Sequence, residues 1–181
     1  MKLPKRKKAL RMMEEAGCSQ MVIDHCISVT KVAMRLAEML RRQGIDLDLE
    51  LVRIGALMHD LGRSRTHSVE HGAIGGQLAR EMGLPEALTR IIERHVGAGI
   101  TSKEAERIGL PKRSYVPETL EEKIVAYADK LLEGDRLVDI EVTIEKLGKE
   151  LGSEHPALDR MRALHREMIS LVGPCSDLLK V

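Results

Sequence analysis

The sequence has almost no aromatic residues. Tryptophan and phenylalanine are missing, and Tyr115 and Tyr127 are the two tyrosines in a chain of 181 residues. The core must therefore be built from aliphatic side chains and from the ten methionines. Proteins that bind single-stranded nucleic acid stack the bases on aromatic rings. The shortage of such rings argues against that class of protein, and we expect no nucleic-acid partner.

The chain also lacks a strong net charge, a long apolar run and paired cysteines. Its formal net charge is +1, so no overall field draws it to nucleic acid or to a membrane. No apolar run approaches the roughly 18 residues of a membrane span, and the basic segment 2–8 is interpreted as a solvated chain end. Cys18, Cys26 and Cys175 form no CxxC pair, which indicates reduced thiols. We expect a cytoplasmic protein.

Apolar residues recur at three- and four-residue steps along most of the chain, which predicts an all-α fold. A length of 181 residues fits one domain. We find neither the alternation typical of a strand nor an internal repeat. Helices are predicted over about 4–16, 19–43, 48–60, 70–82, 85–96, 118–133, 139–151 and 156–172. A connector is predicted over 61–69, and one short helix near 102–107 within the irregular stretch 97–117.

The dipeptide His59-Asp60 ends an apolar run at 51–58 and is followed by Leu61-Gly62-Arg63. Burying His or Asp without a partner is costly, and both residues are good metal ligands. Adjacent helical residues point about 100° apart, but near a helix end both side chains can still reach one ion. The alternative is a half-exposed helix end that holds no metal. The pair alone does not separate these two interpretations.

Three other residues are candidate ligands, each with an ordinary alternative. His25 lies beside the apolar stripe of the second predicted helix, where a lone histidine is more often a core residue than a ligand. His95 lies near the end of its helix, where a basic residue also complements the helix dipole. Asp129 is flanked by apolar residues within a helix and needs a cation or a donor, although Lys130 points to a different side of the helix.

The remaining histidines divide into two pairs. His67 and His71 are four residues apart, which would place them on one face of a helix, but the connector makes a continuous helix doubtful there. His155 precedes a proline and is interpreted as a helix-start residue. His165 lies among charged residues of the last helix and is interpreted as solvated. We assign no function to His155 or His165.

The order of His25, His59-Asp60 and Asp129 resembles the H…HD…D signature of the HD-domain superfamily of metal-dependent phosphohydrolases. The segment 59–63 is similar to the HDIG variant of this signature, with Leu61 in place of Ile and with Arg63 where the variant often has Lys. The resemblance covers about residues 19–136. It implies an HD-domain helical bundle, followed by a C-terminal helical extension over about 137–181.

The same resemblance implies a two-metal site. His71 and His95 match the additional pair of dinuclear members, and the glycine four residues after His71 favours that residue over His67. The expected ligands are His25, His59, Asp60 and Asp129 for one ion, and His71 and His95 for the other, with Asp60 bridging. Imidazole and carboxylate ligands suit Fe or Mn, with Zn, Co, Ni and Mg as alternatives, and no thiolate is expected at the site.

The implied reaction is hydrolysis of a phosphate ester or phosphoanhydride of a nucleotide or other small molecule. A hydroxide held between two ions is the expected nucleophile, and Asp60, Arg63, Lys130 and His67 are the expected catalytic residues. Arg63 and Lys130 would contact phosphate oxygens, and His67 would donate a proton to the leaving group; surface solvation is the alternative for the two cations.

Two other functions stay open on the sequence. Some members of the superfamily hold a di-iron centre on the same ligand set and oxidise a substrate with O₂. A sensing module for nucleotide or metal would also keep the fold without catalysis. The absence of the Gly-Tyr-Pro motif disfavours the best-known branch of cyclic-dinucleotide phosphodiesterases. The sequence does not indicate an oligomeric state.

Overall fold

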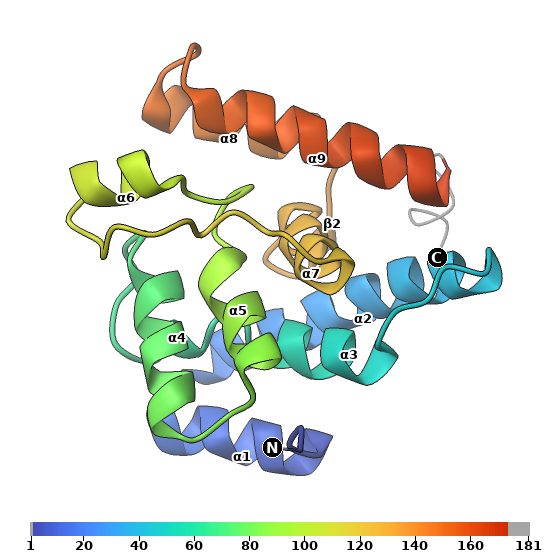
Figure 1. Ribbon diagram of the computed structural model, residues 1–181, viewed down its shortest axis with the longest axis vertical. Coiled ribbons are helices and arrows are strands. Elements are labelled where there is room, and N and C mark those ends of the chain that lie inside the picture. Colours follow the sequence, from blue (N-terminus) through green and yellow to red (C-terminus); the bar gives the residue numbers. More distant parts are fainter. Residues whose placement is uncertain (1, 174–181) are drawn as a thin grey trace.

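The computed structural model describes residues 2–173 as a bundle of α-helices with one very small sheet (Figure 1). In chain order the elements are α1 (Arg6–Ala16), α2 (Gln20–Arg42), α3 (Leu49–Met58), the 3₁₀ helix η1 (Leu61–Ser64), α4 (His71–Glu81), α5 (Glu86–Arg94), α6 (Ser102–Arg107), α7 (Leu120–Lys130), β1 (Leu132–Glu133), β2 (Arg136–Leu137), α8 (Ile140–Leu151) and α9 (Pro156–Val172). The prediction of an all-α fold is confirmed. The connector over 61–69 contains η1 and no longer helix.

The prediction that the chain has no strands was wrong at one place. β1 and β2 form a two-stranded antiparallel sheet in which Glu133 pairs with Arg136. Gly134 lies in the two-residue turn with a φ of +63°, a conformation that favours glycine. The pairing also ends α7 at Lys130, three residues before the predicted end. Gly134-Asp135 is a hairpin signal that the helical periodicity of the flanking residues had masked.

Local sequence signals explain where the helices start and stop. The Asp48 carboxylate accepts hydrogen bonds from the backbone N–H groups of Glu50 and Leu51 at the start of α3, as predicted for a helix cap. Gly17 ends α1 with a φ of +96°. Thr101 and Glu104 cap the short helix α6 reciprocally.

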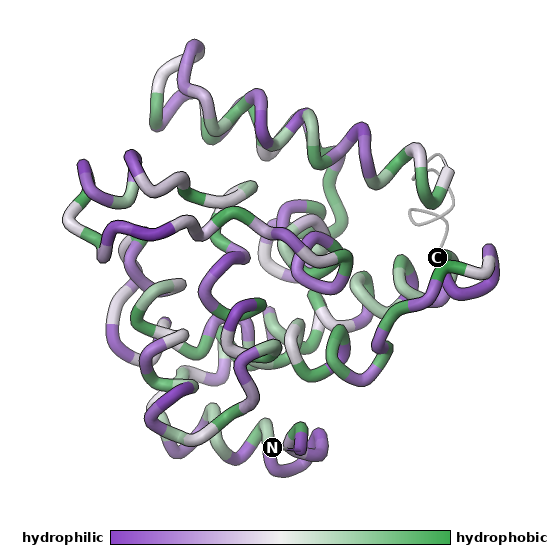
Figure 2. The backbone as a smooth tube through the Cα atoms, in the orientation of Figure 1, coloured by the Kyte–Doolittle hydropathy of each residue, from purple (hydrophilic) through white to green (hydrophobic). Residues whose placement is uncertain are grey.

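Two clusters of buried aliphatic side chains form the core, and α2 contributes to both. One cluster packs the N-terminal part of α2 against α1, α3 and α5. The other packs the rest of α2 against α3, α7, α8 and α9. The tube in Figure 2 shows apolar segments concentrated toward the interior of the bundle. On α2, His25 directly precedes Cys26 of the first cluster and lies about one turn before Val29 of the second. The packing of both clusters therefore positions His25.

Helices α8 and α9 form a separate layer across the top of the bundle in Figure 1, opposite α1. Thr143 of α8 donates a hydrogen bond from its hydroxyl to the Lys130 carbonyl at 2.7 Å, which ties this layer to the end of α7. The predicted extension beyond residue 173, with Cys175, lies outside the described residues.

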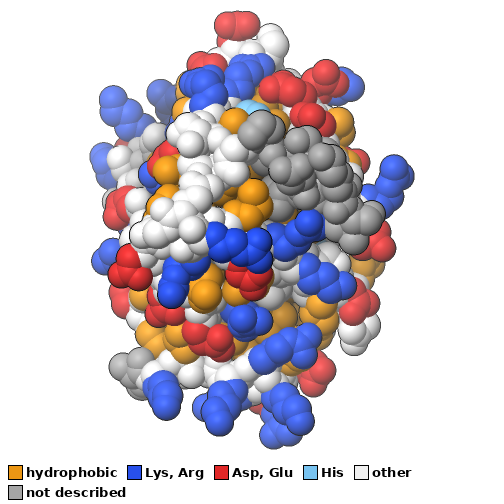
Figure 3. All heavy atoms as spheres, turned by 90° about the vertical axis from the view of Figure 1, so that its right-hand side faces the viewer, with side chains coloured by type: hydrophobic (Ala, Val, Ile, Leu, Met, Phe, Trp, Pro, Cys, Tyr) orange, Lys and Arg blue, Asp and Glu red, His pale blue; other side chains and the backbone are white. Residues whose placement is uncertain are grey.

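The surface carries charges of both signs. Figure 3 shows Lys and Arg side chains interspersed with Asp and Glu over one face, with Lys and Arg predominating at its lower end. The basic side chains of Lys2, Lys5 and residues 6–8 are exposed, consistent with a solvated segment. Within the described residues, no helix combines the length and apolar character needed to cross a membrane.

Candidate metal centre

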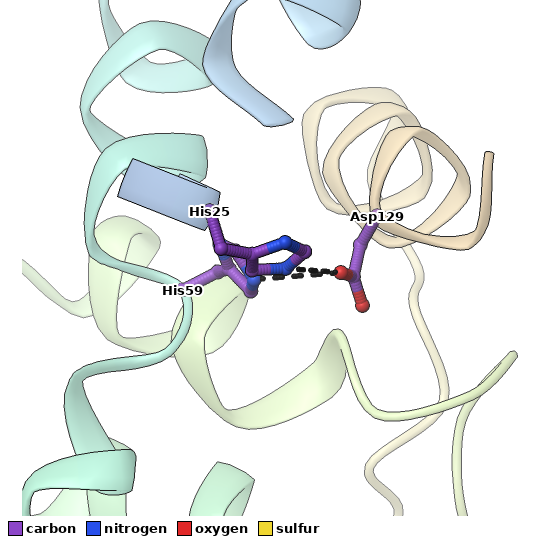
Figure 4. Close-up of side chains that lie close together, drawn as sticks. All are labelled: His25, His59 and Asp129. Atoms are coloured by element: carbon purple, nitrogen blue, oxygen red, sulfur yellow. Dashed lines mark hydrogen bonds and ion pairs between the residues drawn. The ribbon is translucent and has the colours of Figure 1, made fainter. Parts of the chain in front are cut away.

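His25, His59 and Asp129 come from α2, the end of α3 and α7, and they converge on one point (Figure 4). The Asp129 carboxylate lies 3.0 Å from Nε2 of His25 and 3.6 Å from Nε2 of His59. Their side chains are 22%, 0% and 11% exposed for His25, His59 and Asp129, so the opening to solvent lies on the side of His25. One possible ligand atom from each lies within 4.8 Å of the others, a spacing suited to a single ion.

A second group forms beside the first from Asp60, His71 and His95. Oδ1 of Asp60 lies 3.3 Å from Nε2 of His71 and 3.3 Å from Nε2 of His95. The other carboxylate oxygen lies 3.7 Å from Nε2 of His59. Asp60 therefore faces both groups, one oxygen toward each, which is the position that a bridging ligand requires. The structure thus brings all six residues predicted as ligands into one cluster.

All four histidines of the cluster are oriented in the same way by backbone carbonyls. His59, His71 and His95 each donate a hydrogen bond from Nδ1–H to the carbonyl three residues earlier, at 2.7–2.8 Å. His25 donates from Nδ1–H to the carbonyl of Gly134, 3.1 Å away in the hairpin. A carbonyl only accepts, so these bonds place a ring proton on Nδ1 and direct Nε2 toward the centre. Metal-binding histidines are oriented in this manner.

The inward-facing nitrogens need a cation. Nε2 of His71 and Nε2 of His95 are 3.0 Å apart, and with both ring protons on Nδ1 these are two lone pairs facing each other. Nε2 of His59 is buried and makes no hydrogen bond to any residue between 2 and 173. A buried polar atom without a partner is rare in folded proteins. The donor set fits divalent metal ions bound by imidazole and carboxylate.

The charges of the two carboxylates support the same interpretation. Burial raises the pKa of Asp129, but Lys130, His25 and His59 together lower it well below its usual range. Burial likewise raises the pKa of Asp60, and His59 and His95 lower it well below the usual range. Both carboxylates are therefore ionised at neutral pH, as metal ligands must be.

The imidazoles respond to their surroundings in two ways. Burial and the neighbouring His95 lower the pKa of His71 to about 3, and burial also lowers the pKa of His95. Burial lowers the pKa of His59 as well, but Cys26, Asp60 and Asp129 raise it well above its usual value. A proton is thus attracted to the nitrogen that faces both carboxylates, at the place where an ion would bind.

The expectation that no thiol lies at the site was wrong. The sulfur of Cys26, which follows His25 on α2, lies within 4.8 Å of possible ligand atoms of His59 and Asp60, and Cys26 is fully buried. The adjacency to His25 was visible in the sequence, but the apolar periodicity of α2 assigned Cys26 to the core. A soft ligand at this distance widens the range of metals that the cluster could accept.

The cations predicted to bind phosphate lie at the cluster but pair with its carboxylates. Nε of Arg63 lies 3.3 Å from Asp60, and one of its terminal nitrogens donates to the backbone carbonyl of His67 at 2.7 Å. Nζ of Lys130 pairs with Asp129, contrary to the expectation that it points to another side of α7. The His67 side chain is exposed and lies apart from the ligand cluster.

One further aromatic side chain, His165, differs from its predicted environment. His165 is half-buried, and its Nδ1 lies 2.8 Å from the Tyr127 hydroxyl, so its interpretation as a solvated residue was wrong. Tyr127 itself is fully buried and Tyr115 is 2% exposed. Neither ring can therefore stack a base. His155 caps α9 by accepting a hydrogen bond from the Ala157 N–H, as expected for a helix-start residue.

A cavity of about 740 Å³ opens directly over the cluster. His25, Asp60, His71 and Asp129 line it, together with Arg63, Lys130 and His67. Residues of α6, α8 and α9 and of the loops around them also line it. This volume lies in the range of cavities that hold small-molecule ligands. Sequence reasoning assigned no role to α8 and α9, because no residue there belongs to a recognisable motif.

The reactivity of Cys18 tests how deeply this side chain is buried beside the segment 59–63. Its thiol contacts the Leu61 carbonyl at 3.7 Å, and burial, with smaller contributions from Cys26 and Asp60, raises its pKa from 9.0 to about 11. The folded protein should then hold roughly 100-fold less Cys18 thiolate than the unfolded chain at pH 8. We expect alkylation of Cys18 by iodoacetamide to be slower by at least that factor, measured by peptide mass spectrometry with and without urea.

The raised pKa of Cys18 also determines how its contribution to the free energy of unfolding changes with pH. The protonated thiol is favoured in the folded state, so this contribution is complete below pH 9 and is lost as the pH rises toward 11. Equal alkylation rates in the folded and unfolded protein at pH 8 would contradict the buried placement of Cys18.

Comparisons with known proteins identify the family of this chain. The HD-domain family model matches residues 22–134. An uncharacterized protein of Methanocaldococcus jannaschii is 47% identical over 165 residues, covering 91% of this chain and 97% of that protein. A tRNA (cytidine(56)-2'-O)-methyltransferase of Picrophilus torridus is 39% identical, and Ribonuclease Y of Cutibacterium acnes is 32% identical. The matches cover 94% and 86% of this chain, but only 48% and 27% of those two proteins.

The fold also resembles a solved structure. The HD domain of the Listeria monocytogenes phosphodiesterase PgpH, solved in complex with cyclic-di-AMP, superposes with a TM-score of 0.54. The match covers 92% of this chain and 98% of that chain, at 15% sequence identity. At this identity the likeness concerns the fold.

Proposed function

The chain belongs to the HD-domain superfamily of metal-dependent phosphohydrolases, and we propose that it hydrolyses a phosphate ester bond of a nucleotide at the six-residue cluster. The observation that carries this proposal is the position of Asp60, with one oxygen toward His59 and the other toward His71 and His95. We further propose that the catalytic core spans about residues 19–136 and that the following helices belong to the same domain.

We propose that the cluster holds two divalent ions. His25, His59, Asp60 and Asp129 would bind one, and Asp60, His71 and His95 the other, with Fe or Mn favoured and Zn, Co, Ni and Mg as alternatives. When bound, such ions make a water molecule acidic enough to attack at neutral pH and neutralise the negative charge of the phosphate. The carbonyl-bound imidazoles would keep their orientation without rearrangement, because their Nδ1 protons are already committed.

We propose that the two cations beside the cluster bind the substrate phosphate. Arg63 and Lys130 neutralise Asp60 and Asp129 in the structure, and both line the cavity. We propose that each turns from its carboxylate to a phosphate oxygen once metal ions neutralise the carboxylates. Arg63 offers a planar donor fork for this contact. The exposed His67 at the cavity edge would reach the leaving group and donate a proton to it.

The choice of a nucleotide rests on the relatives. A neighbour in fold is described in complex with cyclic-di-AMP, and two sequence relatives carry names that concern RNA. These names partly conflict with our expectation that nucleic acid is not a partner. A phosphodiester between nucleosides is the bond that cyclic dinucleotides and RNA share. We therefore propose a small nucleotide or short oligonucleotide as the substrate and the cytoplasm as the location.

The test is a metal analysis combined with a substrate screen. Protein purified without oxygen should contain up to two ions per chain, and it should hydrolyse a phosphodiester from a panel of bis(p-nitrophenyl) phosphate, cyclic dinucleotides, short RNA and ATP. A chelator should remove both the ions and the activity, and added Mn²⁺ should restore them.

Two results of this screen would overturn the proposal. Consumption of O₂ with a substrate and without release of a phosphorylated product would favour a di-iron oxygenase. Tight nucleotide binding by the metal-loaded protein, with no hydrolysis of any member of the panel, would favour a sensing module.

A further inference from the structure

The cavity over the metal centre has a mixed lining. The ionisable side chains of the cluster line it, with Arg63 and Lys130. Residues of α6, α8 and α9 line it as well, and they combine apolar side chains such as Leu147 and Met161 with charged ones such as Glu104, Arg107 and Lys146. Helices α8 and α9 lie beyond residue 134, where the match to the HD-domain family model ends.

Exposed apolar side chains also line this cavity. Among residues 2–173 the large apolar side chains that are exposed are Met21, Val69, Met82, Ile108, Val142 and Leu151. Three of these line the cavity: Val69 at 44%, Ile108 at 42% and Leu151 at 46% exposure. We call these three residues the apolar rim. They come from the loop before α4, the end of α6 and the end of α8, so tertiary folding alone brings them to one cavity.

The wall that carries the rim is held in place by Arg160 of α9. One terminal nitrogen of Arg160 donates to the Gly99 carbonyl at 3.1 Å and to the Glu104 carboxylate at 2.8 and 2.9 Å. These bonds join α9 to α6, whose end carries Ile108, and Figure 1 shows the two elements on the same side of the molecule. The hydrogen bond from Thr143 to the Lys130 carbonyl joins α8 to the end of α7. These contacts therefore fix α8 and α9 relative to α6 and to the metal centre.

We propose that the apolar rim of Val69, Ile108 and Leu151 binds the nucleobase of a substrate whose phosphate lies at the metal centre. This inference rests on the proposed function for the position of the phosphate. A nucleotide has an anionic phosphate and a flat, largely apolar base, and the cavity offers Arg63 and Lys130 beside the cluster and the three apolar side chains of the rim. The rim is aliphatic because neither tyrosine is available, since both rings are buried in the core. Burial of the base against these side chains would supply affinity.

The test compares the binding of nucleotides with that of the same phosphate without a base. Calorimetric titration in the presence of Mn²⁺ would use the four common nucleoside 5′-monophosphates and ribose 5-phosphate. We expect the best nucleotide to bind at least about tenfold more tightly than ribose 5-phosphate. The double variant Ile108→Ser and Leu151→Ser should bind that nucleotide about tenfold less tightly and should bind ribose 5-phosphate as before.

Val142→Ser is the matched control. Val142 lies on α8 and is 44% exposed, like the rim residues, but it does not line the cavity. It should change neither affinity. Because Ile108 and Leu151 are both largely exposed, their replacement should leave the melting temperature unchanged, and the single variant Leu151→Ser should show part of the loss.

Three results would overturn the proposal. Equal binding of nucleotides and ribose 5-phosphate by the unmodified protein would show that no base is recognised. Equal weakening of both ligands in the double variant would show that the rim only supports the cavity. A dimer that the double variant disrupts would show that a second copy covers the rim. Because these are binding measurements, a failure of hydrolysis leaves them intact, and the two proposals fail separately.

Discussion

Replacing Asp60 with Asn is expected to remove metal binding and to lower kcat/KM by at least about 1,000-fold, or about 4 kcal/mol of transition-state stabilisation. Of the two carboxylates in the cluster, Asp60 is the one whose two oxygens face different groups of imidazoles. The amide keeps the shape of the side chain but loses the charge that would hold two ions. Elemental analysis and hydrolysis of bis(p-nitrophenyl) phosphate by the purified variant would measure the two effects.

Asp24→Asn makes the same chemical change outside the cluster. Asp24 is exposed on α2, next to His25, and accepts a hydrogen bond from Gln20 at 2.8 Å. It should keep both its metal content and its activity. Full activity in the Asp60 variant, with the control unchanged, would remove the basis of the proposed mechanism.

Replacing Gly62 with Ala should have the largest effect on stability. A Cβ atom at this position would lie 1.9 Å from the backbone oxygen of His71 and 2.7 Å from the backbone nitrogen of Gly75. Both contacts are with backbone, so no side chain can move aside. We expect a loss of about 3 kcal/mol or more, or a melting temperature lower by roughly 6–12 °C. The shift of His71 should also weaken metal binding.

Gly148→Ala is the control for this substitution. Gly148 lies within α8, and a Cβ there would approach Leu158 no closer than 3.4 Å. Alanine favours a helix by about 1 kcal/mol over glycine, so this variant should be as stable as the unmodified protein or slightly more stable. Similar melting temperatures for the two variants would show that the close approach of η1 to α4 is not required.

The Gly62 result bears on the motif at 59–63. In the sequence, Gly62 lies between the predicted ligands His59 and Asp60 and the cation Arg63, and nothing local shows why a glycine is needed. In the structure, it lets η1 lie against the start of α4, which brings His71 within 3.3 Å of Asp60. The residue without a side chain thus decides the distance between two residues that carry the chemistry.

The sequence alone determined most of the helices and predicted six metal ligands. Apolar periodicity and caps such as Asp48 act within a few residues, so they can be read from the chain without knowledge of its neighbours. The sequence analysis missed the hairpin at Gly134, because the helical periodicity of the flanking residues masked its turn signal. The thiol of Cys26 beside the cluster and the wall that α8 and α9 form over the cavity depend on how the helices pack, which no local pattern specifies.

Only the tertiary structure decided that the ligands converge and how they are oriented. His25 and Asp129 are 104 residues apart in the sequence and 3.0 Å apart in space, and the carbonyl that orients His25 belongs to a hairpin 109 residues away. Such contacts depend on how whole helices pack against one another, which local propensities do not specify. For the same reason the apolar rim, assembled from three distant segments, has no signature in the sequence.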